Sequence, residues 1–157
     1  MNIELIVIGK TDSKEVASLV EMYGKRVNHY CKFSITTLPD VKNTKSLSIN
    51  QQRSLEGEAI LRQTEPSDYV VLLDERGSEM RSIEFADWLQ KRMLSGVRRL
   101  VLVIGGPYGF SSEVYNRANQ RLSLSKMTFS HQIVRAIFTE QLYRAFAILN
   151  NDPYHHE

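Results

Sequence analysis

Short apolar runs alternate along this chain with stretches in which apolar residues recur every three or four positions. A short apolar run bounded by turn-forming residues is typical of a buried strand. Such runs predict strands at residues 3–8, 33–38, 69–73, 99–104 and 122–124. The alternation of strands with helical stretches is the signature of an α/β fold.

The stretches between these runs predict helices. Val16, Val20 and Tyr23 lie on one face of a helix that we expect to continue to about Tyr30. Residues 41–47 are polar and predict a mobile loop. Further helices are predicted at about 48–62, from Ser82 to about Met93, after Ser111 or Ser112, and at about 133–149.

The runs at 69–73 and 99–104 are apolar at nearly every position, as expected when helices cover both faces of a parallel sheet. We therefore predict an α/β fold with a mainly parallel sheet sandwiched by helices. The chain of 157 residues is long enough for one sizeable core and too short for two large ones. Residues 1–157 are expected to form a single domain.

Composition and charge restrict the class of protein. Hydrophobic residues make up 42% and charged residues 24% of the chain, as in ordinary globular proteins. No apolar run approaches the roughly 20 residues of a membrane span, and Met1-Asn-Ile-Glu-Leu5 lacks the basic leader of a signal peptide. The net charge of +2 permits an RNA partner without requiring one. Cys31, the single cysteine, allows no intrachain disulfide, so we expect a packed thiol in a cytoplasmic protein.

Several common catalytic motifs are absent from the sequence. Gly9-Lys10-Thr11 resembles the end of a P-loop, but the leading glycine of that motif would be residue 4, which is Glu4. The glycines of residues 105–109 do not follow the dinucleotide-binding pattern. No H-E-x-x-H, C-x-x-C or G-x-S-x-G motif occurs, so neither a metal site nor a serine hydrolase is predicted.

The most informative segment is residues 100–146. The apolar strand at 99–104 ends in Gly105-Gly106, and ligands of open α/β sheets bind at the carboxyl ends of strands. A serine-rich apolar run at 122–130 and a helix start near His131 follow closely. These consecutive segments predict one pocket, which we interpret as a cofactor site.

Five motifs carry a resemblance to a known family. They are Ile104-Gly-Gly-Pro107, Leu124-Ser-x-x-Thr128, His131-x-x-Val-Arg135, Glu140-x-Leu-Tyr-Arg-Ala145 and Pro153-Tyr-His155. In this order and at this length the chain resembles the SPOUT class of RNA methyltransferases, the α/β-knot fold. Within that class it is most similar to the small RlmH-type enzymes, which methylate N3 of a pseudouridine in 23S rRNA.

The resemblance implies a trefoil knot, in which the C-terminal third of the chain threads through a loop and forms a pocket for S-adenosylmethionine. Backbone groups of such a bare loop can read the adenine edge, and glycines let the main chain approach closely. The implied cofactor-binding residues are Leu73, Gly105, Gly106, Leu124, Ser125, Lys126, Met127, Thr128 and Phe129.

The resemblance also implies a set of catalytic and substrate-binding residues. N3 of pseudouridine carries a proton, and His131 is the natural acceptor because imidazole exchanges protons near neutral pH. Arg144 would bind phosphate or stabilise the N3 anion, and Tyr154 would stack on a base. Arg135, Tyr143 and His155 are the implied substrate-binding residues, with Arg135, Tyr143 and Arg144 expected on the more polar side of the last helix.

Each of these residues also has a purely structural interpretation. His131 can be a helix-start residue satisfied by the backbone, and Arg144 can form an i,i+4 pair with Glu140. Tyr154 can belong to a disordered tail, and Lys126 can simply be solvated. His156 stands where several relatives carry arginine, so a phosphate contact there would be weaker or pH-dependent.

The resemblance finally implies a homodimer that acts on assembled ribosomes, with a site shared by two subunits and ribosomal RNA as substrate. A SPOUT methyltransferase with another RNA target is one alternative. A catalytically silent ribosome-binding or assembly factor of the same fold is another, and it would bind the cofactor weakly or not at all. An α/β protein that binds a different nucleotide is the remaining one.

Overall fold

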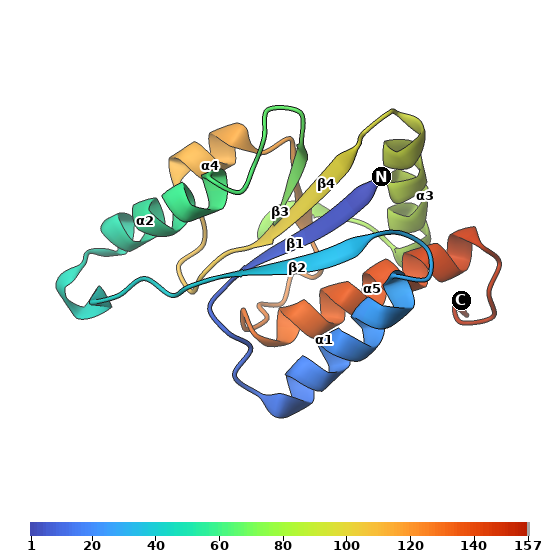
Figure 1. Ribbon diagram of the computed structural model, residues 1–157, viewed down its shortest axis with the longest axis horizontal. Helices are drawn as coiled ribbons and strands as arrows, with labels where there is room; N and C mark the ends of the chain where they lie inside the picture. The colour runs from blue at the N-terminus through green and yellow to red at the C-terminus, as the bar shows by residue number, and fades with distance from the viewer. Residues whose placement is uncertain (157) are drawn as a thin grey trace.

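The computed structural model describes residues 1–156 and contains one sheet of five parallel strands in the order β2-β1-β4-β3-β5 (Figure 1). The strands are β1 (Asn2–Ile8), β2 (Phe33–Leu38), β3 (Tyr69–Glu79), β4 (Arg99–Ile104) and β5 (Gln120–Ser123). The helices are α1 (Lys14–Val27), α2 (Ile49–Leu61), α3 (Ser82–Leu94), α4 (Ser112–Arg117) and α5 (Ile133–Leu149).

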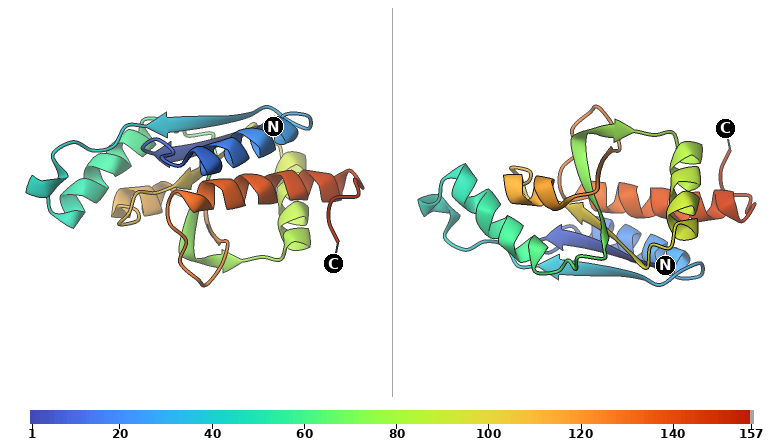
Figure 2. Two further views of the ribbon diagram at one scale, coloured as in Figure 1. Left: turned by 90° about the horizontal axis from the view of Figure 1, so that it is seen from below. Right: turned by 90° about the horizontal axis from the view of Figure 1, so that it is seen from above.

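Helices cover both faces of the sheet, which Figure 2 shows from two opposite sides. Alternate strand residues point to opposite faces, so Leu5 packs in one core and its neighbour Ile6 in the other. The larger core includes Phe138 and Leu142 of α5 together with side chains of α1 and α3, and the smaller core lies under α2 and α4. The predicted parallel α/β sandwich is confirmed.

Helix starts follow local capping chemistry. Ser48 caps α2 with a full capping box, in which its hydroxyl accepts from Gln51 N and the Gln51 side chain accepts from Ser48 N. Ser111 caps α4, which resolves the choice between Ser111 and Ser112. The loop at 41–47 contains a short 3-10 helix, Thr44–Ser46.

Two strand predictions were wrong in their bounds by more than one residue. β3 continues six residues beyond the predicted end at Leu73, and β5 begins at Gln120 and ends at Ser123 instead of spanning 122–124. The polar extension of β3 pairs with β5 across a register shift between Leu73 and Ser78. A Cβ on Gly77 would lie 2.6 Å from the Arg121 carbonyl carbon, so only glycine permits this close approach.

Cys31 packs against the larger core, as predicted, and burial raises the pKa of its thiol to about 11. None of the helices within residues 1–156 combines the length and the apolar character that a bilayer crossing requires.

Candidate functional site

A cavity of about 700 Å³ opens at the carboxyl edge of the sheet, a size typical of small-molecule sites. The ends of β4, β3 and β5 frame it, and the segment between β5 and α5 closes it. The lining therefore comes from residues 73–76, 104–110 and 122–131 except Lys126, and from Arg53, Tyr115 and Val134.

Eight of the nine predicted cofactor-binding residues line this one cavity. They are Leu73, Gly105, Gly106, Leu124, Ser125, Met127, Thr128 and Phe129. Lys126, the ninth, is exposed and does not line the cavity, which agrees with its alternative interpretation as a solvated side chain.

The turn after β4 brings bare backbone to the cavity wall. Gly106 O accepts a hydrogen bond from Gly109 N at 3.2 Å, and Gly109 has a positive φ of 80°. A Cβ on Gly106 would lie 2.2 Å from the Glu56 Oε2 atom, so the turn and the carboxylate are in direct contact. A side chain at 106 would therefore displace the Glu56 carboxylate.

Hydrogen bonds shape the segment between β5 and α5. Ser123 Oγ donates to Ser125 O at 2.8 Å, and Met127 N donates to Ser125 Oγ at 2.9 Å. Thr128 Oγ1 donates to the Glu75 carboxylate at 2.8 Å, which ties the segment to the extension of β3. Met127 is 77% exposed and therefore lies at the mouth of the cavity.

Sequence reasoning missed a polar pair that lines the cavity, Tyr115 and Asp74. The Tyr115 hydroxyl donates to Asp74 Oδ2 at 2.7 Å, and Arg76 N donates to Asp74 Oδ1 at 3.0 Å. Burial, reinforced by the bond to Asp74, raises the pKa of Tyr115 to about 12. The position of Asp74 directly after the apolar residues of β3 was the signal that could have identified it.

His131 lines the cavity just before α5 begins. Its neighbours fix this helix start to the loop after β1. Gln132 donates to Lys10 O at 3.0 Å and accepts from Asp12 N at 2.9 Å. The imidazole thus stands on a backbone that is attached to the carboxyl edge of the sheet.

The prediction that Arg135 lies on the polar side of α5 is wrong, because the side chain is only 2% exposed. Its guanidinium donates to Ile8 O at 2.7 Å, Gly9 O at 2.8 Å and His131 O at 3.0 Å. Helical periodicity could not reveal these acceptors, since they include backbone carbonyls at the end of β1. Arg135 positions the helix start that carries His131.

A second cluster gathers near the C-terminal end of α5. Arg144 pairs with Glu140 at 2.6 Å, so the predicted i,i+4 pair is present. The Tyr154 hydroxyl donates to the Glu140 carboxylate at 2.9 Å. The centroid of the Tyr154 ring lies 4.6 Å from that of the Tyr143 ring, and the Arg144 guanidinium lies over the Tyr154 ring. Burial raises the pKa of Tyr154, and Arg144 Nη1 lies 3.2 Å from His155 Nδ1.

The structure does not bring this C-terminal cluster to the cavity within one chain. A rise of about 1.5 Å per residue places Arg144 about 17 Å beyond Ile133 along α5. His131 and the cluster of Tyr143, Arg144, Tyr154 and His155 therefore lie at opposite ends of one helix.

Known proteins resemble this chain over its whole length. A family model described as "Predicted SPOUT methyltransferase" matches residues 1–155. The protein named "Ribosomal RNA large subunit methyltransferase H" in Christiangramia forsetii is 59% identical over 156 residues, 99% of either chain. Proteins of the same name in Parabacteroides distasonis and Porphyromonas gingivalis are 54% and 55% identical over 157 residues, 100% of either chain.

Proposed function

Because this chain belongs to the SPOUT methyltransferase family, we propose that it transfers a methyl group from S-adenosylmethionine to N3 of a pseudouridine in 23S rRNA. The family predicted from the sequence motifs is confirmed, and membership implies the knotted C-terminal segment. The relatives named as methyltransferases of large-subunit rRNA support the choice of substrate.

The cavity at the carboxyl edge is the observation that carries the proposal, because its lining fits the cofactor. Apolar side chains of Leu73, Leu124 and Met127 can flank an adenine ring, while the backbone of Gly105 and Gly106 is free of side chains. S-adenosylmethionine supplies an activated methyl group on a sulfonium. The protein then has to align the acceptor nitrogen with that methyl group.

His131 is the residue that we propose as acceptor of the N3 proton. It lines the same cavity as the cofactor-binding residues, and imidazole exchanges protons near neutral pH. Arg135 holds the carbonyl of His131 at 3.0 Å, so the imidazole stands on a fixed backbone. To take the proton, the imidazole must lie within hydrogen-bond distance of N3 of the pseudouridine. A helix start with a fixed backbone can hold it at that distance.

A homodimer would complete the site. Arg144, Tyr154 and His155 lie at the far end of α5 from the cavity, so a second copy must present its cluster there if these residues act on the same base. The cluster continues onto α1, where Arg26 lies over the rings of Tyr23 and of Tyr143. Large rings and arginines are the residues that most often anchor interfaces.

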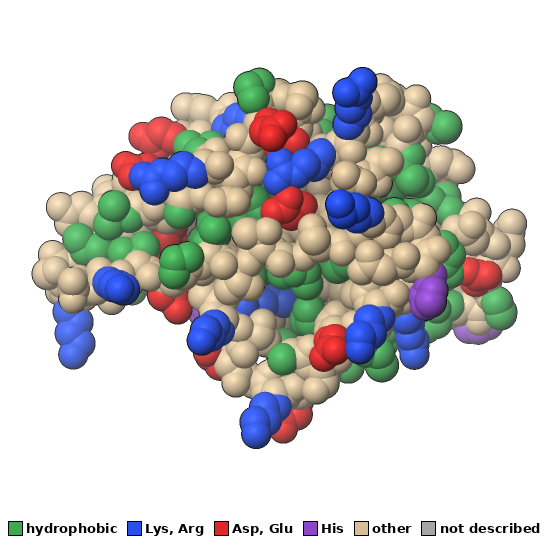
Figure 3. All heavy atoms as spheres, viewed as in Figure 1, with side chains coloured by type: hydrophobic (Ala, Val, Ile, Leu, Met, Phe, Trp, Pro, Cys, Tyr) green, Lys and Arg blue, Asp and Glu red, His purple; other side chains and the backbone are tan. Residues whose placement is uncertain are grey.

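Recognition of the ribosome by a small, nearly neutral chain requires several contributions. Figure 3 shows Lys and Arg side chains dispersed among acidic ones over the visible face, with no continuous basic stripe. We therefore propose that the pocket, the second subunit and the surface of the cytoplasmic ribosome together select the target base. This arrangement agrees with the net charge of +2.

The first experiment is calorimetric titration with S-adenosylmethionine, followed by mass spectrometry of 23S rRNA from ribosomes that lack the methyl group and were incubated with protein and cofactor. We expect binding and a mass gain of one methyl at a pseudouridine. Gly106→Val should abolish detectable binding, because the added carbons displace Glu56 and the turn. Gly24→Ala is the matched control, since its Cβ would meet Phe33 at an ordinary 3.6 Å.

The outcomes separate the alternatives. Cofactor binding without methylation of 23S rRNA would favour a SPOUT methyltransferase with another RNA target. If the protein associates with ribosomes but binds no cofactor, whether it is free or bound to the ribosome, an assembly factor is favoured over an enzyme. Equal binding by wild-type protein and Gly106→Val would move the cofactor away from the glycine turn.

A further inference from the structure

One buried acid lies directly behind the cavity wall. Glu56 belongs to α2 and is only 4% exposed. A Cβ on Gly106 would lie 2.2 Å and 2.7 Å from its two carboxylate oxygens, and Gly106 itself lines the cavity. The main chain of a single glycine therefore stands between this carboxylate and the space where a ligand would bind.

Glu56 lacks a strong cationic partner in the part of the chain that the structure describes. The side-chain amide of Gln52 donates to Oε1 at 3.1 Å, and burial raises the pKa of the carboxyl group. Asp40 also raises this pKa, whereas His131 lowers it. A buried carboxylate without an ion-pair partner is energetically costly, so a cation placed nearby is favoured.

Two arginines at this edge of the sheet, Arg53 and Arg135, have other partners than Glu56. The Arg53 Nε atom donates to Tyr108 O at 2.7 Å, on the same turn that Glu56 supports. The guanidinium of Arg135 is bonded to backbone carbonyls and to the Thr11 hydroxyl. Both cations are thus bonded to neutral oxygens, and neither forms an ion pair with Glu56 within residues 1–156.

The proposed cofactor and its product differ in charge at one atom. S-adenosylmethionine carries a sulfonium and has a net charge of about +1 near neutral pH, whereas S-adenosylhomocysteine is a neutral thioether with net charge near zero. Because a buried charge interacts strongly across a low-dielectric wall, the pocket can distinguish these two ligands electrostatically.

We propose that Glu56 is the residue that makes the pocket prefer the sulfonium cofactor over the thioether product. The inference rests on the proposed function, since it takes S-adenosylmethionine as the ligand. Loss of the methyl group removes the attraction to Glu56, and the product leaves more readily than the cofactor. Glu56 then sets specificity through charge without touching the reacting atoms.

The test compares wild-type protein, Glu56→Gln and Glu58→Gln by calorimetry with both ligands. Glu56→Gln keeps the shape and removes the charge. Glu58→Gln removes the same charge two residues away, where the side chain is 61% exposed and pairs with Arg62 at 3.5 Å. We expect Glu56→Gln to lower the preference for S-adenosylmethionine over S-adenosylhomocysteine about tenfold, mainly through weaker cofactor binding. Glu58→Gln should leave the ratio of the two affinities unchanged.

A structural role of Glu56 gives a different result. If Glu56→Gln lowers the affinity for both ligands equally, or changes neither affinity, the inference is overturned although the proposed cofactor still binds. If wild-type protein binds neither ligand, the proposed function itself fails, and the inference with it.

A measurement on wild-type protein guards against poor folding of the variant. An analogue that carries an ammonium group in place of the sulfonium should bind more tightly than S-adenosylhomocysteine. Equal or weaker binding of that cationic analogue would overturn the role of charge.

Discussion

Two arginines at opposite edges of the sheet, Arg99 and Arg135, have partners of different charge. Arg99 begins β4 at the amino edge and binds the carboxylates of Glu4 and Asp68. Arg135 reaches the carboxyl edge from α5 and binds the backbone carbonyls of Ile8 and Gly9. One cation is neutralised by acids, whereas the other is solvated by peptide groups.

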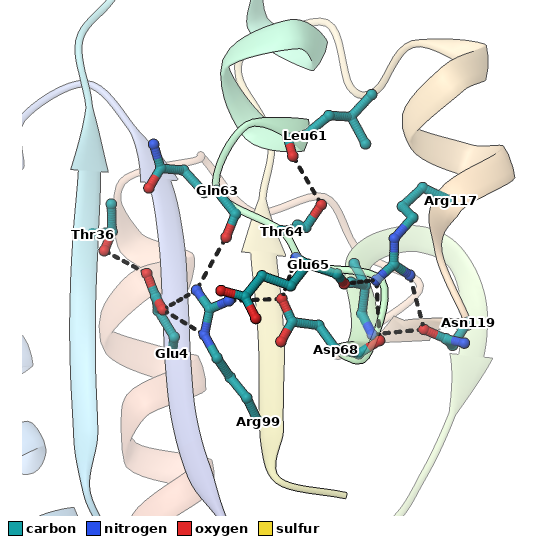
Figure 4. A network of polar contacts seen from close by, with 11 residues as sticks. Glu4, Thr36, Leu61, Gln63, Thr64, Glu65, Asp68, Arg99, Arg117 and Asn119 are labelled. Carbon is teal, nitrogen blue, oxygen red and sulfur yellow. Dashed lines mark hydrogen bonds and ion pairs between the residues drawn. The ribbon is translucent and has the colours of Figure 1, made fainter.

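The amino edge is closed by a network of charged and polar side chains (Figure 4). Asp68 Oδ2 accepts from Arg99 at 2.6 Å and from Glu65 N at 2.7 Å. Arg117 donates to Glu65 O at 2.6 Å and to Asp68 O at 3.1 Å. These bonds connect the segments that precede β3 and β5, so their role is to hold strand starts in register.

The carboxyl edge keeps its charges apart. Glu56 and Arg135 are both buried there, and neither forms an ion pair within residues 1–156. A neutralised edge stabilises the fold but offers little to a charged ligand. An edge with separated charges costs stability and can bind and orient a ligand, which is the property that an active site requires.

The largest effect on stability is expected from Arg99→Met. The substitution leaves Asp68, whose side chain is 2% exposed, and Glu4 without their cation, which should lower the free energy of unfolding by about 3 kcal/mol. Urea denaturation measures this change. Affinity for S-adenosylmethionine should stay the same in the folded variant. A loss of affinity as large as that of Gly106→Val would show that the two edges are coupled.

Arg135→Met is expected to have a smaller effect on stability and a larger one on the site. Its lost partners are neutral carbonyls, so we expect the free energy of unfolding to fall by about 2 kcal/mol. Release of His131 O should lower the rate of methyl transfer at saturating cofactor at least tenfold. Parallel kinetics of Arg135→Met and Arg99→Met test this contrast, which fails if both variants lose activity equally.

The smallest effect is expected from Tyr115→Phe, which removes the polar pair with Asp74. The pKa of Tyr115 is raised from about 10 in the unfolded chain to about 12 in the folded one. Between about pH 10 and 12 the Tyr115 hydroxyl therefore ionises in the unfolded chain but not in the folded one, which favours unfolding. The wild-type protein should therefore lose stability as pH rises from about 10 to 12, and Tyr115→Phe should show less of this loss. At neutral pH the variant should be destabilised by about 0.5 kcal/mol.

Tyr108→Phe is the matched control for this measurement, since Tyr108 lies on the same cavity and is 45% exposed. Alkaline unfolding curves followed by circular dichroism compare the three proteins. Identical curves for wild-type protein and Tyr115→Phe would show that the Tyr115 hydroxyl does not contribute to the alkaline loss of stability.

Local patterns predicted most elements closely. The bounds of β2 and β4 agree with the apolar runs, and those of α5 agree with the helical spacing of apolar residues. The extension of β3 was missed because residues 74–79 are polar and become a strand only by pairing with β5. Ordered motifs located the cavity, but they could not show that Glu56 of α2 supports Gly106.

The sequence by itself determined the alternation of strands and helices, the glycine turn after β4 and the family to which the chain belongs. These features depend on neighbouring residues and on motif order, which a linear pattern retains. Only the tertiary structure decided that Arg99 is paired with acids and Arg135 with carbonyls, and that Glu56 stands behind the cavity wall. Such partners are far apart in the chain, and it is the packing of the sheet that decides which charge is buried beside which neighbour.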